Sequence, residues 1–315
     1  MKKMLLSMLA GIVCMSSFAQ GESHEYFYFS PQMMATHVKD YSEGEKAAIA
    51  QDLSVVRSVC FAAKGDNQEG QRPLYIATAG GPGARKTTIL ERFLASRYPN
   101  TSIAYLDPDQ RALKFMVHTY FSQSLSAFSV ANAENYSLAV KSAYERWRGA
   151  SNYITLTLFE EAIAQRRNIA HGTTSTGGHI PTFLAKLKEA DYDIVLVLCS
   201  CEDDFRRQAI QYRNEEQKFY QSTPEDAVSK GKVFPERMSA YFTYADTLYL
   251  YWSDDLFHPE HLAAVLTKGK MEVLDQTYLD KFVHKYENDR TSLLVEGKSI
   301  PSWNELVSLF QSRQF

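Results

Sequence analysis

The segment from Leu74 to Thr88 constrains the fold of this chain more than any other. Leu74–Ala79 is a short apolar run typical of a buried strand, and Gly80–Thr87 reads GGPGARKT at the start of an expected helix. A glycine-rich turn in this position points consecutive backbone N–H groups into one concavity, where the helix N-terminus adds positive potential. The segment therefore predicts a phosphate-binding loop in an α/β fold.

Individual positions of this loop have expected roles. We expect Lys86 to contact the β- and γ-phosphates of a nucleotide and the Thr87 hydroxyl to ligate Mg²⁺. Arg85 occupies the position that is glycine in the usual pattern, where a side chain must adopt the dihedral angles for which glycine was chosen. The alternative is a glycine-rich turn that binds nothing. The predicted nucleotide-binding residues are Gly80, Gly81, Pro82, Gly83, Ala84, Arg85, Lys86, Thr87 and Thr88.

Strands alternate with helices along the rest of the chain. Besides Leu74–Ala79, we expect strands at Ser102–Leu106, Asn168–Ala170, Ile194–Cys199 and Thr247–Trp252. The clearest helices between them are Glu134–Arg148 and Leu156–Gln165. This alternation predicts an α/β fold with a parallel sheet of about five strands flanked by helices, as in P-loop NTPases.

The expected domain organisation is one α/β domain with additions at both ends. We assign residues 1–19 to a signal peptide, 20–72 to a helical lead-in, 73–255 to the P-loop domain and 256–315 to a C-terminal helical extension. In that extension, Lys268–Lys270 and Asn288–Ser299 are expected to separate helices.

The first residues have the layout of a secretory signal. Lys2 and Lys3 precede an apolar run from Met4 to Met15, and Ser17 and Ala19 supply the two small residues for cleavage after Ala19. The apolar run is short for a membrane span, so we expect no stable membrane anchor after cleavage. The predicted location is periplasmic or secreted, or cytoplasmic if the segment is an uncleaved buried helix.

Charge and cysteine content exclude some classes of protein. A net charge of −3, from 34 basic and 37 acidic residues, gives no reason to expect a nucleic-acid partner. Beyond the signal segment, Cys60, Cys199 and Cys201 are too few for a disulfide framework. We expect them to be buried structural thiols.

Asp107-Pro108-Asp109 follows the second expected strand. Ligands of open α/β sheets bind at the carboxyl ends of the strands. A carboxylate there can accept the proton of an attacking hydroxyl or help to hold a metal. The alternative is that one of the two aspartates is a helix N-cap.

Polar and basic residues later in the chain complete the candidate site. The turn Gly172–Gly178 carries hydroxyl and N–H groups that can hold a sugar or a phosphate, and His171 precedes it. Cations that neutralise a phosphoryl group are available in a basic segment, although a solvated helix face would have the same composition. These cations are Arg206, Arg207, Arg213, Lys230, Lys232 and Arg237.

Taken in order, these elements resemble the zeta-toxin family of P-loop kinases. The resemblance runs from about Leu74 to Asp254 and is carried by the loop at Gly80–Thr87, Asp107-Pro108-Asp109, Gly172–Ser175, Gly231–Glu236 and Ala245-Asp246. It implies a kinase that uses ATP or GTP with Mg²⁺ to phosphorylate a hydroxyl of a nucleotide sugar, UDP-N-acetylglucosamine. It leaves open whether a protein partner such as an antitoxin binds.

The resemblance also assigns roles by position. Lys86 and Thr87 serve the nucleotide and the metal, and Asp109 matches the catalytic base. Arg213 lies near a lid arginine, and Arg237 remains in a lid that is poorer in arginine than usual. The resulting catalytic set is Asp109, Lys86, Arg213 and Arg237, and the acceptor set is Asp107, His171, Gly172 and Thr173.

Two departures from the family pattern support a second hypothesis. Arg85 replaces a glycine, and His171 replaces an acidic residue that contacts the acceptor. A catalytically inactive relative that retains the fold and acts by binding would tolerate both changes. The two hypotheses are therefore an active small-molecule kinase and an inactive P-loop binding protein.

Overall fold

The computed structural model describes residues 26–61, 71–128, 133–217, 220 and 222–313. The predicted signal peptide, residues 1–19, lies outside the described residues. None of the helices in the described part of the chain is both long and apolar enough to cross a bilayer.

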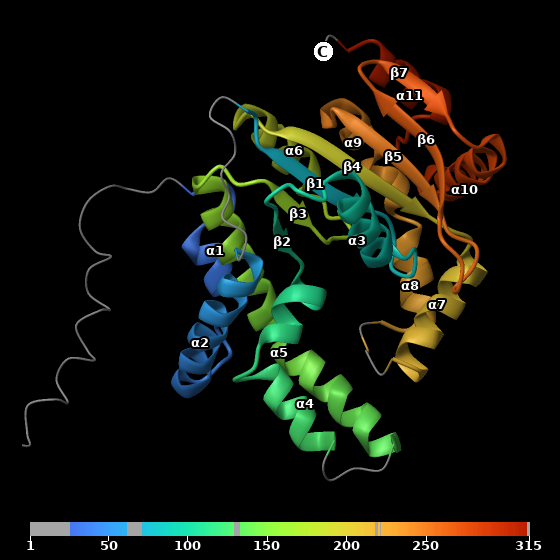
Figure 1. Ribbon diagram of the computed structural model, residues 1–315. Helices are drawn as coiled ribbons and strands as arrows, with labels where there is room; N and C mark the ends of the chain where they lie inside the picture. Colours follow the sequence, from blue (N-terminus) through green and yellow to red (C-terminus); the bar gives the residue numbers. More distant parts are fainter. Residues whose placement is uncertain (1–25, 62–70, 129–132, 218–219, 221, 314–315) are drawn as a thin grey trace, which may run out of the picture.

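A mixed sheet forms the centre of the molecule (Figure 1). Within the described residues it has seven strands in the order β2-β3-β1-β4-β5-β6-β7. Five strands are parallel, which confirms the predicted parallel sheet: β1 (Leu74–Ala79), β2 (Ala104–Leu106), β3 (Ile169–His171), β4 (Asp193–Ser200) and β5 (Thr247–Trp252). Two antiparallel strands continue the sheet beyond β5: β6 (His261–Thr267) and β7 (Lys270–Val273).

Helices cover both faces of this sheet. In chain order they are α1 (Pro31–Ala35), α2 (Glu43–Cys60), α3 (Lys86–Arg97), the π-helical turn η2 (Pro108–Leu113), α4 (Tyr120–Phe128), α5 (Ala133–Ala164), α6 (Ile180–Glu189), α7 (Asp203–Glu215), α8 (Pro224–Gly231), the 3₁₀ turn η3 (Phe234–Arg237), α9 (Met238–Tyr244), α10 (Gln276–Val295) and α11 (Trp303–Gln311). Successive side chains of a strand point to opposite faces. Ile76 of β1 therefore packs with Phe93 of α3 on one face, whereas Tyr75 packs with Phe159 of α5 and Phe183 of α6 on the other.

Strand β1 lies in the middle of the parallel part. It pairs along its whole length with β4, from Leu74 opposite Asp193 to Ala79 opposite Leu198, and it also pairs with β3. Its residues from Tyr75 to Ala79 are buried, as expected for a strand covered on both faces. The carboxyl ends of β1, β2 and β3 therefore meet at one edge, which brings the glycine-rich loop close to Asp107 and Gly172.

The C-terminal segment 256–315 is not the purely helical extension that we expected. It first forms the hairpin of β6 and β7 and only then the helices α10 and α11. Lys268 and Gly269 at the hairpin turn have φ values of 47° and 71°, as a two-residue turn between twisted strands requires. The apolar residues of His261–Thr267 are compatible with either a helix or a strand. They form a strand because they pair with β5.

Helix α5 also differs from the prediction. The expected helices at Glu134–Arg148 and Leu156–Gln165 are parts of one helix of 32 residues. Gly149 does not interrupt it but allows a close approach, since a Cβ there would lie 2.6 Å from the carbonyl oxygen of His37. The Tyr41 hydroxyl donates to the Arg146 carbonyl at 2.5 Å and accepts from the Ala150 N–H at 3.3 Å, so it bridges two groups of the helix backbone.

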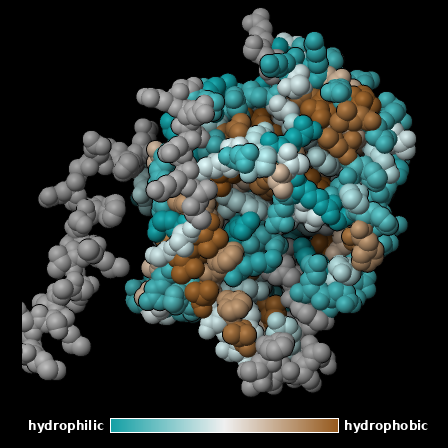
Figure 2. Space-filling view, viewed as in Figure 1, coloured by the Kyte–Doolittle hydropathy of each residue, from teal (hydrophilic) through white to brown (hydrophobic). Residues whose placement is uncertain are grey.

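The C-terminal elements pack against the far edge of the sheet. Helix α10 packs on β5 and β6, and α11 packs on α9. In Figure 2 hydrophobic residues gather at the upper right, over this part of the molecule. Val273 and Leu274 of the C-terminal segment are exposed. Cys60, Cys199 and Cys201 are buried free thiols, as predicted. In the described part of the chain, no group of three or more His, Cys, Asp or Glu side chains could hold a metal ion.

Candidate active site

The glycine-rich loop leaves the end of β1 and runs into α3. Gly80 and Gly83 have φ values of 145° and 82°, which residues with a side chain rarely adopt. A Cβ on Gly80 would lie 2.2 Å from the carbonyl oxygen of Cys199, so the loop passes close to β4. Helix α3 begins at Lys86 without a side-chain cap, and the first N–H groups of a helix have no partner within it. The loop therefore has the geometry of an anion-binding turn.

Arg206 of α7 holds the other side of the loop. Its side chain is buried, and Nη1 donates to the Pro82 carbonyl at 2.6 Å. A Cβ on Gly81 would lie 2.3 Å from Nη1 of Arg206, and one on Gly83 would lie 2.8 Å from its Cγ. These glycines thus make room for the arginine as well as for the turn. Arg206 shapes the phosphate loop and does not extend into the cavity.

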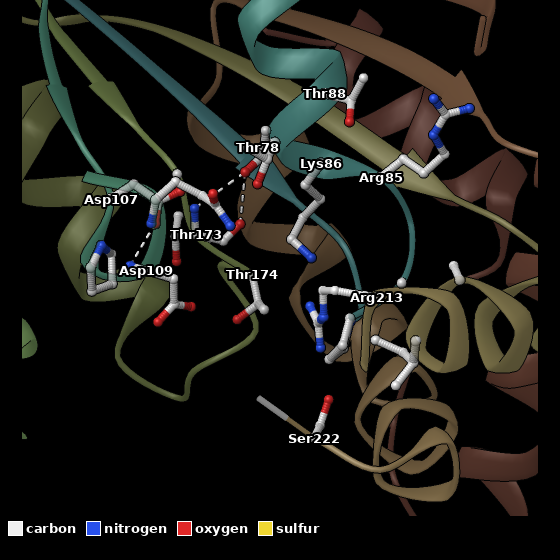
Figure 3. A pocket seen from close by; sticks show the side chains of 18 of the residues that line it. Thr78, Arg85, Lys86, Thr88, Asp107, Asp109, Thr173, Thr174, Arg213 and Ser222 are labelled. Carbon is white, nitrogen blue, oxygen red and sulfur yellow. Dashed lines mark hydrogen bonds between the residues drawn. The ribbon is translucent and has the colours of Figure 1, made fainter. Parts of the chain in front are cut away.

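Arg85 occupies the position that is usually glycine, and its side chain points away from the loop (Figure 3). Its backbone is left-handed, with φ 53° and ψ 24°, a conformation that costs a residue with a side chain about 1 kcal/mol. Its Nη1 donates to the carbonyls of Asp255 and His258 at 2.7 and 2.6 Å. Its Nε lies 3.0 Å from Oε1 of Glu260. Arg85 therefore does not fill the concavity.

A cavity of about 650 Å³ opens at the carboxyl edge of the sheet. The predicted residues that line it are Pro82, Gly83, Arg85, Lys86, Thr87, Thr88, Asp107, Pro108, Asp109, His171, Gly172, Thr173, Thr174, Arg213 and Lys230. Figure 3 shows Lys86 and Arg213 facing the space that Asp109 and Thr174 face from the other side. The structure thus brings the predicted phosphate loop together with the predicted acceptor residues around Asp109.

Lys86 is the cation at the centre of this cavity. Its Nζ donates to the Gly81 carbonyl at 2.8 Å. Burial lowers the pKa of Lys86 to about 8, and the positive charges of Arg206 and Arg213 add to this effect. An anion in the cavity would favour the charged form of Lys86, because it would offset both causes.

Asp107 combines a structural and a chemical role. Its Oδ1 accepts from the N–H groups of Asp109 and Gln110, both at 2.8 Å, so it is the N-cap of η2. Burial, together with the charge of Asp109, raises the pKa of Asp107 to about 6. A Cβ on Gly172 would lie 2.0 Å from Oδ2 of Asp107, so the glycine makes room for this carboxylate. The N-cap alternative is thereby confirmed for Asp107, which also lines the cavity.

Asp109 extends from η2 into the cavity. Its Oδ1 lies 3.1 Å from Nη1 of Arg148, and its side chain is 20% exposed. Burial raises the pKa of Asp109 above the ordinary range, while Arg148, Arg213 and Lys86 oppose that shift. Asp109 is therefore a stronger base than a solvated aspartate and is oriented by a neighbouring cation.

His171 ends β3 on the wall of the cavity. Its Nδ1 lies 2.9 Å from the Tyr75 hydroxyl, and its ring contacts that of Phe159. Burial lowers the pKa of His171 to about 4, with a further contribution from His179. At neutral pH it is an uncharged hydrogen-bonding group where the family pattern has an acid.

The turn Gly172–Gly178 is bonded to β1. The Thr78 hydroxyl donates to the Thr173 carbonyl at 2.7 Å and accepts from the Thr173 N–H at 3.2 Å. The Gly80 N–H donates to the Thr174 carbonyl at 3.0 Å, which connects the turn to the phosphate loop. The turn therefore holds a defined position beside the loop.

Arg237 is not among the residues that line the cavity. Its Nε donates to the carbonyls of Thr176 and Gly177 at 3.1 and 2.9 Å, and Nη1 lies 3.4 Å from Oε2 of Glu236. The structure thus places this predicted catalytic arginine outside the cavity, where it holds the turn. The reason is its place in η3, which lies between α8 and α9.

Among the cavity residues that sequence reasoning missed, two lie beside Asp109. Tyr144 and Arg148 of α5 both line the cavity. Their spacing places them on one face of a helix, which was a usable signal. Only the packing of α5 against η2 brings that face to the carboxyl edge of the sheet.

Together, the sheet and the loop define a class of protein. Parallel strands in the order 2-3-1-4-5, with a glycine-rich loop between β1 and α3, form the fold of the P-loop kinases. The chain belongs to the zeta toxin family, whose members are P-loop phosphotransferases: the model of that family, described as Zeta toxin, matches residues 59–238, more than half of the chain.

Two solved structures of the AvrRxo1-ORF1:-ORF2 complex share this fold. A structure of AvrRxo1-ORF1:-ORF2 with ATP is 14% identical, with a TM-score of 0.53 over 93% of this chain and 96% of that chain. The native AvrRxo1-ORF1:-ORF2 complex is 15% identical, with a TM-score of 0.52 over 90% of this chain and 94% of that chain. A structure of the PezAT toxin–antitoxin system of Streptococcus pneumoniae is 16% identical, with a TM-score of 0.48 over 81% and 98%. A search of curated proteins found no match.

Proposed function

We propose that this protein is a kinase that transfers the γ-phosphate of ATP or GTP to a hydroxyl group of a small molecule. The observation that carries the proposal is the shared cavity of Lys86 and Asp109, in which the charge of Lys86 acts on the pKa of Asp109. A cationic phosphate site and a carboxylate base in one cavity are the two requirements of phosphoryl transfer to an alcohol. By family resemblance, the acceptor is a nucleotide sugar such as UDP-N-acetylglucosamine.

The phosphate side of the cavity consists of the loop, Lys86 and Arg213. The uncapped N-terminus of α3 supplies N–H donors, and Lys86 supplies a charge next to them. Arg213 lines the cavity from α7 and faces it beside Lys86 (Figure 3). These groups would neutralise the charge that spreads over the phosphate oxygens in the transition state.

The acceptor side consists of Asp109 and its surroundings. Asp109 would accept the proton of the acceptor hydroxyl, and Arg148 at 3.1 Å orients it. Asp107, His171, Gly172 and Thr173 form the wall on which the acceptor would lie. His171 is neutral, so it offers the acceptor a hydrogen bond and not a charge.

The residues present also suit Mg²⁺. Thr87 is the second residue of α3 and lines the cavity, and the carboxylates of Asp107 and Asp109 line it as well. Hydroxyl and carboxylate oxygens together with phosphate oxygens are the ligands that Mg²⁺ prefers. When bound, the ion would draw charge from the transferring phosphoryl group.

Two observations supported the alternative hypothesis of an inactive binding protein, and the structure removes one of them. Arg85 was one of these observations because it replaces a glycine of the loop, but its side chain donates to the carbonyls of Asp255 and His258 and pairs with Glu260 outside the concavity. His171, in place of an acidic residue, remains as the second observation. An active kinase is therefore the function that the geometry supports best.

Nucleotide binding is the first test, by calorimetry on the chain from Gln20 with ATP and Mg²⁺. We expect binding in the wild type, none in Lys86→Ala, and retained binding in Asp109→Asn. Above pH 8 binding should weaken, because Lys86 with a pKa of about 8 loses its charge there. Failure of a folded wild-type protein to bind ATP or GTP would refute the proposal.

Phosphoryl transfer is the second test, with UDP-sugars as candidate acceptors. We expect wild-type protein to form a phosphorylated acceptor and Asp109→Asn to form none while it still binds ATP. Turnover by Asp109→Asn at the wild-type rate would show that another group is the base. The acceptor that is phosphorylated identifies the substrate class.

A further inference from the structure

The C-terminal segment contacts the phosphate loop although it lies outside the family match, which ends at residue 238. Two sets of contacts connect them. One set joins Arg85 to the connection between β5 and β6, and the other joins Arg206 to α10. Both involve buried charges whose partners lie far apart in the sequence.

The first set of contacts centres on Glu260. Its side chain is 3% exposed and lies 3.0 Å from Nε of Arg85 and 2.8 Å from Nη1 of Arg92. The carbonyls of Asp255 and His258 accept hydrogen bonds from Nη1 of Arg85, at 2.7 and 2.6 Å.

The connection that carries these carbonyls is itself ordered by local bonds. Oδ1 of Asp255 accepts from the N–H groups of Phe257 and His258 at 2.7 and 3.1 Å. The acceptors offered to Arg85 therefore have defined positions. A guanidinium that donates to two carbonyls and forms an ion pair with a carboxylate has little rotational freedom.

The second set of contacts passes through α7. Lys285 of α10 lies 2.6 Å from Oδ1 of Asp289 and 3.1 Å from Oδ1 of Asp203. Asp203 lies 3.6 Å from Nε of Arg206, which donates to the Pro82 carbonyl at 2.6 Å. Lys285 and Arg206 are both buried, so removal of one partner would leave charge in the interior.

These contacts explain how an arginine can replace a glycine in the loop. A left-handed residue with a side chain persists only where the surroundings determine its conformation. Arg85 directly precedes Lys86, so the dihedral angles of Arg85 set the direction in which α3 and Lys86 begin. Any freedom at Arg85 would displace the charge that faces the phosphates.

We infer that Glu260 of the C-terminal segment is a positioning residue for nucleotide binding, acting through Arg85 to hold the phosphate loop in its binding conformation. The inference rests on the proposed function, because it assigns a role in the same nucleotide site. It also gives the C-terminal segment a part in the activity of the protein.

A double-mutant cycle tests this coupling. We expect Glu260→Gln and Arg85→Ala each to weaken ATP binding about tenfold, and the double variant to be no weaker than either single variant. Glu287→Gln is the matched control, since Glu287 bonds to Arg290 and to the Trp303 N–H within the same segment. The control should lower the melting temperature and leave the ATP dissociation constant unchanged.

Hydrogen exchange of the loop without nucleotide separates this inference from the proposed function. We expect faster exchange of the amides of residues 80–88 in Glu260→Gln than in the wild type or in Glu287→Gln. Unchanged exchange, unchanged ATP affinity in either single variant, or a further loss in the double variant would overturn the inference. Absence of ATP binding in the wild type would instead refute the proposed function, while exchange still reports on the loop.

Discussion

Asp107 both caps a helical turn and carries a carboxylate with a raised pKa in the cavity. It caps η2 with one oxygen and faces Gly172 with the other, in a position where ionisation is unfavourable. Its pKa is raised from 3.8 to about 6, so the folded state binds the proton more tightly than the unfolded state does. At neutral pH the ionised side chain therefore destabilises the fold.

Replacement of Asp107 by asparagine should stabilise the protein at neutral pH. The asparagine Oδ1 can still accept the two N–H bonds of η2, and no charge is buried. From a pKa shift of roughly two units, we expect the free energy of unfolding to rise by about 3 kcal/mol at pH 7. Chemical denaturation of nucleotide-free protein measures this change.

The pH dependence supplies the control for that experiment. The gain should shrink as the pH falls from 6 toward the unfolded-state pKa of 3.8 and vanish only below about pH 3, where Asp107 is protonated in both states. Asp109→Asn at the same pH values tests whether the neighbouring carboxylate behaves differently. A gain that is independent of pH would show that the charge of Asp107 is not its cause.

At the scale of elements, the turn Gly172–Gly178 and the turn η2 fit against each other. The contact is made by Gly172 and Asp107, which follow β3 and β2. The sequence predicted both segments as ends of strands. It could not show that they touch, because residues that are 65 positions apart meet only when β2 and β3 pair.

Gly172→Ala should disrupt this contact. The new Cβ would lie 2.0 Å from Oδ2 and 2.9 Å from Cβ of Asp107, so the cap of η2 must move. We expect a loss of about 2 kcal/mol in the free energy of unfolding, as for other overpacked sites. Thermal and chemical denaturation measure it.

Gly178→Ala is the matched control in the same turn. Its Cβ would meet only Nη2 of Arg237, at an ordinary distance of 3.8 Å. Its free energy of unfolding should stay within about 0.5 kcal/mol of the wild type. Equal losses in the two variants would contradict the specific contact between Gly172 and Asp107.

At the scale of the whole molecule, location and chemistry have to be reconciled. We propose export through the N-terminal segment, and the proposed reaction requires a nucleoside triphosphate. Extracytoplasmic space normally lacks ATP, so an exported kinase would act inside another cell.

Mass spectrometry of protein expressed from the full sequence tests export. We expect a mature chain that begins at Gln20 and is recovered outside the cytoplasm. Ala19→Lys should prevent cleavage, because the peptidase requires a small residue at that position. An intact chain from Met1 in the cytoplasm of the wild-type strain would contradict export.

The sequence by itself determined where the parallel strands lie along the chain, where the phosphate loop lies, and that Asp109 follows the end of a strand. These features depend on contacts within a few residues: the apolar run of β1, the glycines with positive φ, and a carboxylate at a strand end. Local patterns of this kind are visible in any single segment. They were sufficient to predict the class of fold and the two halves of the site.

Only the tertiary structure decided how the site is completed. It turned Arg85 out of the loop toward Glu260, placed Arg148 beside Asp109 and kept Arg237 outside the cavity. It also made strands of His261–Thr267 and Lys270–Val273. Each outcome depends on groups that are distant in the sequence, because a buried charge takes the partners that packing brings near it. The periodicity of a sequence does not show which distant residues will be in contact.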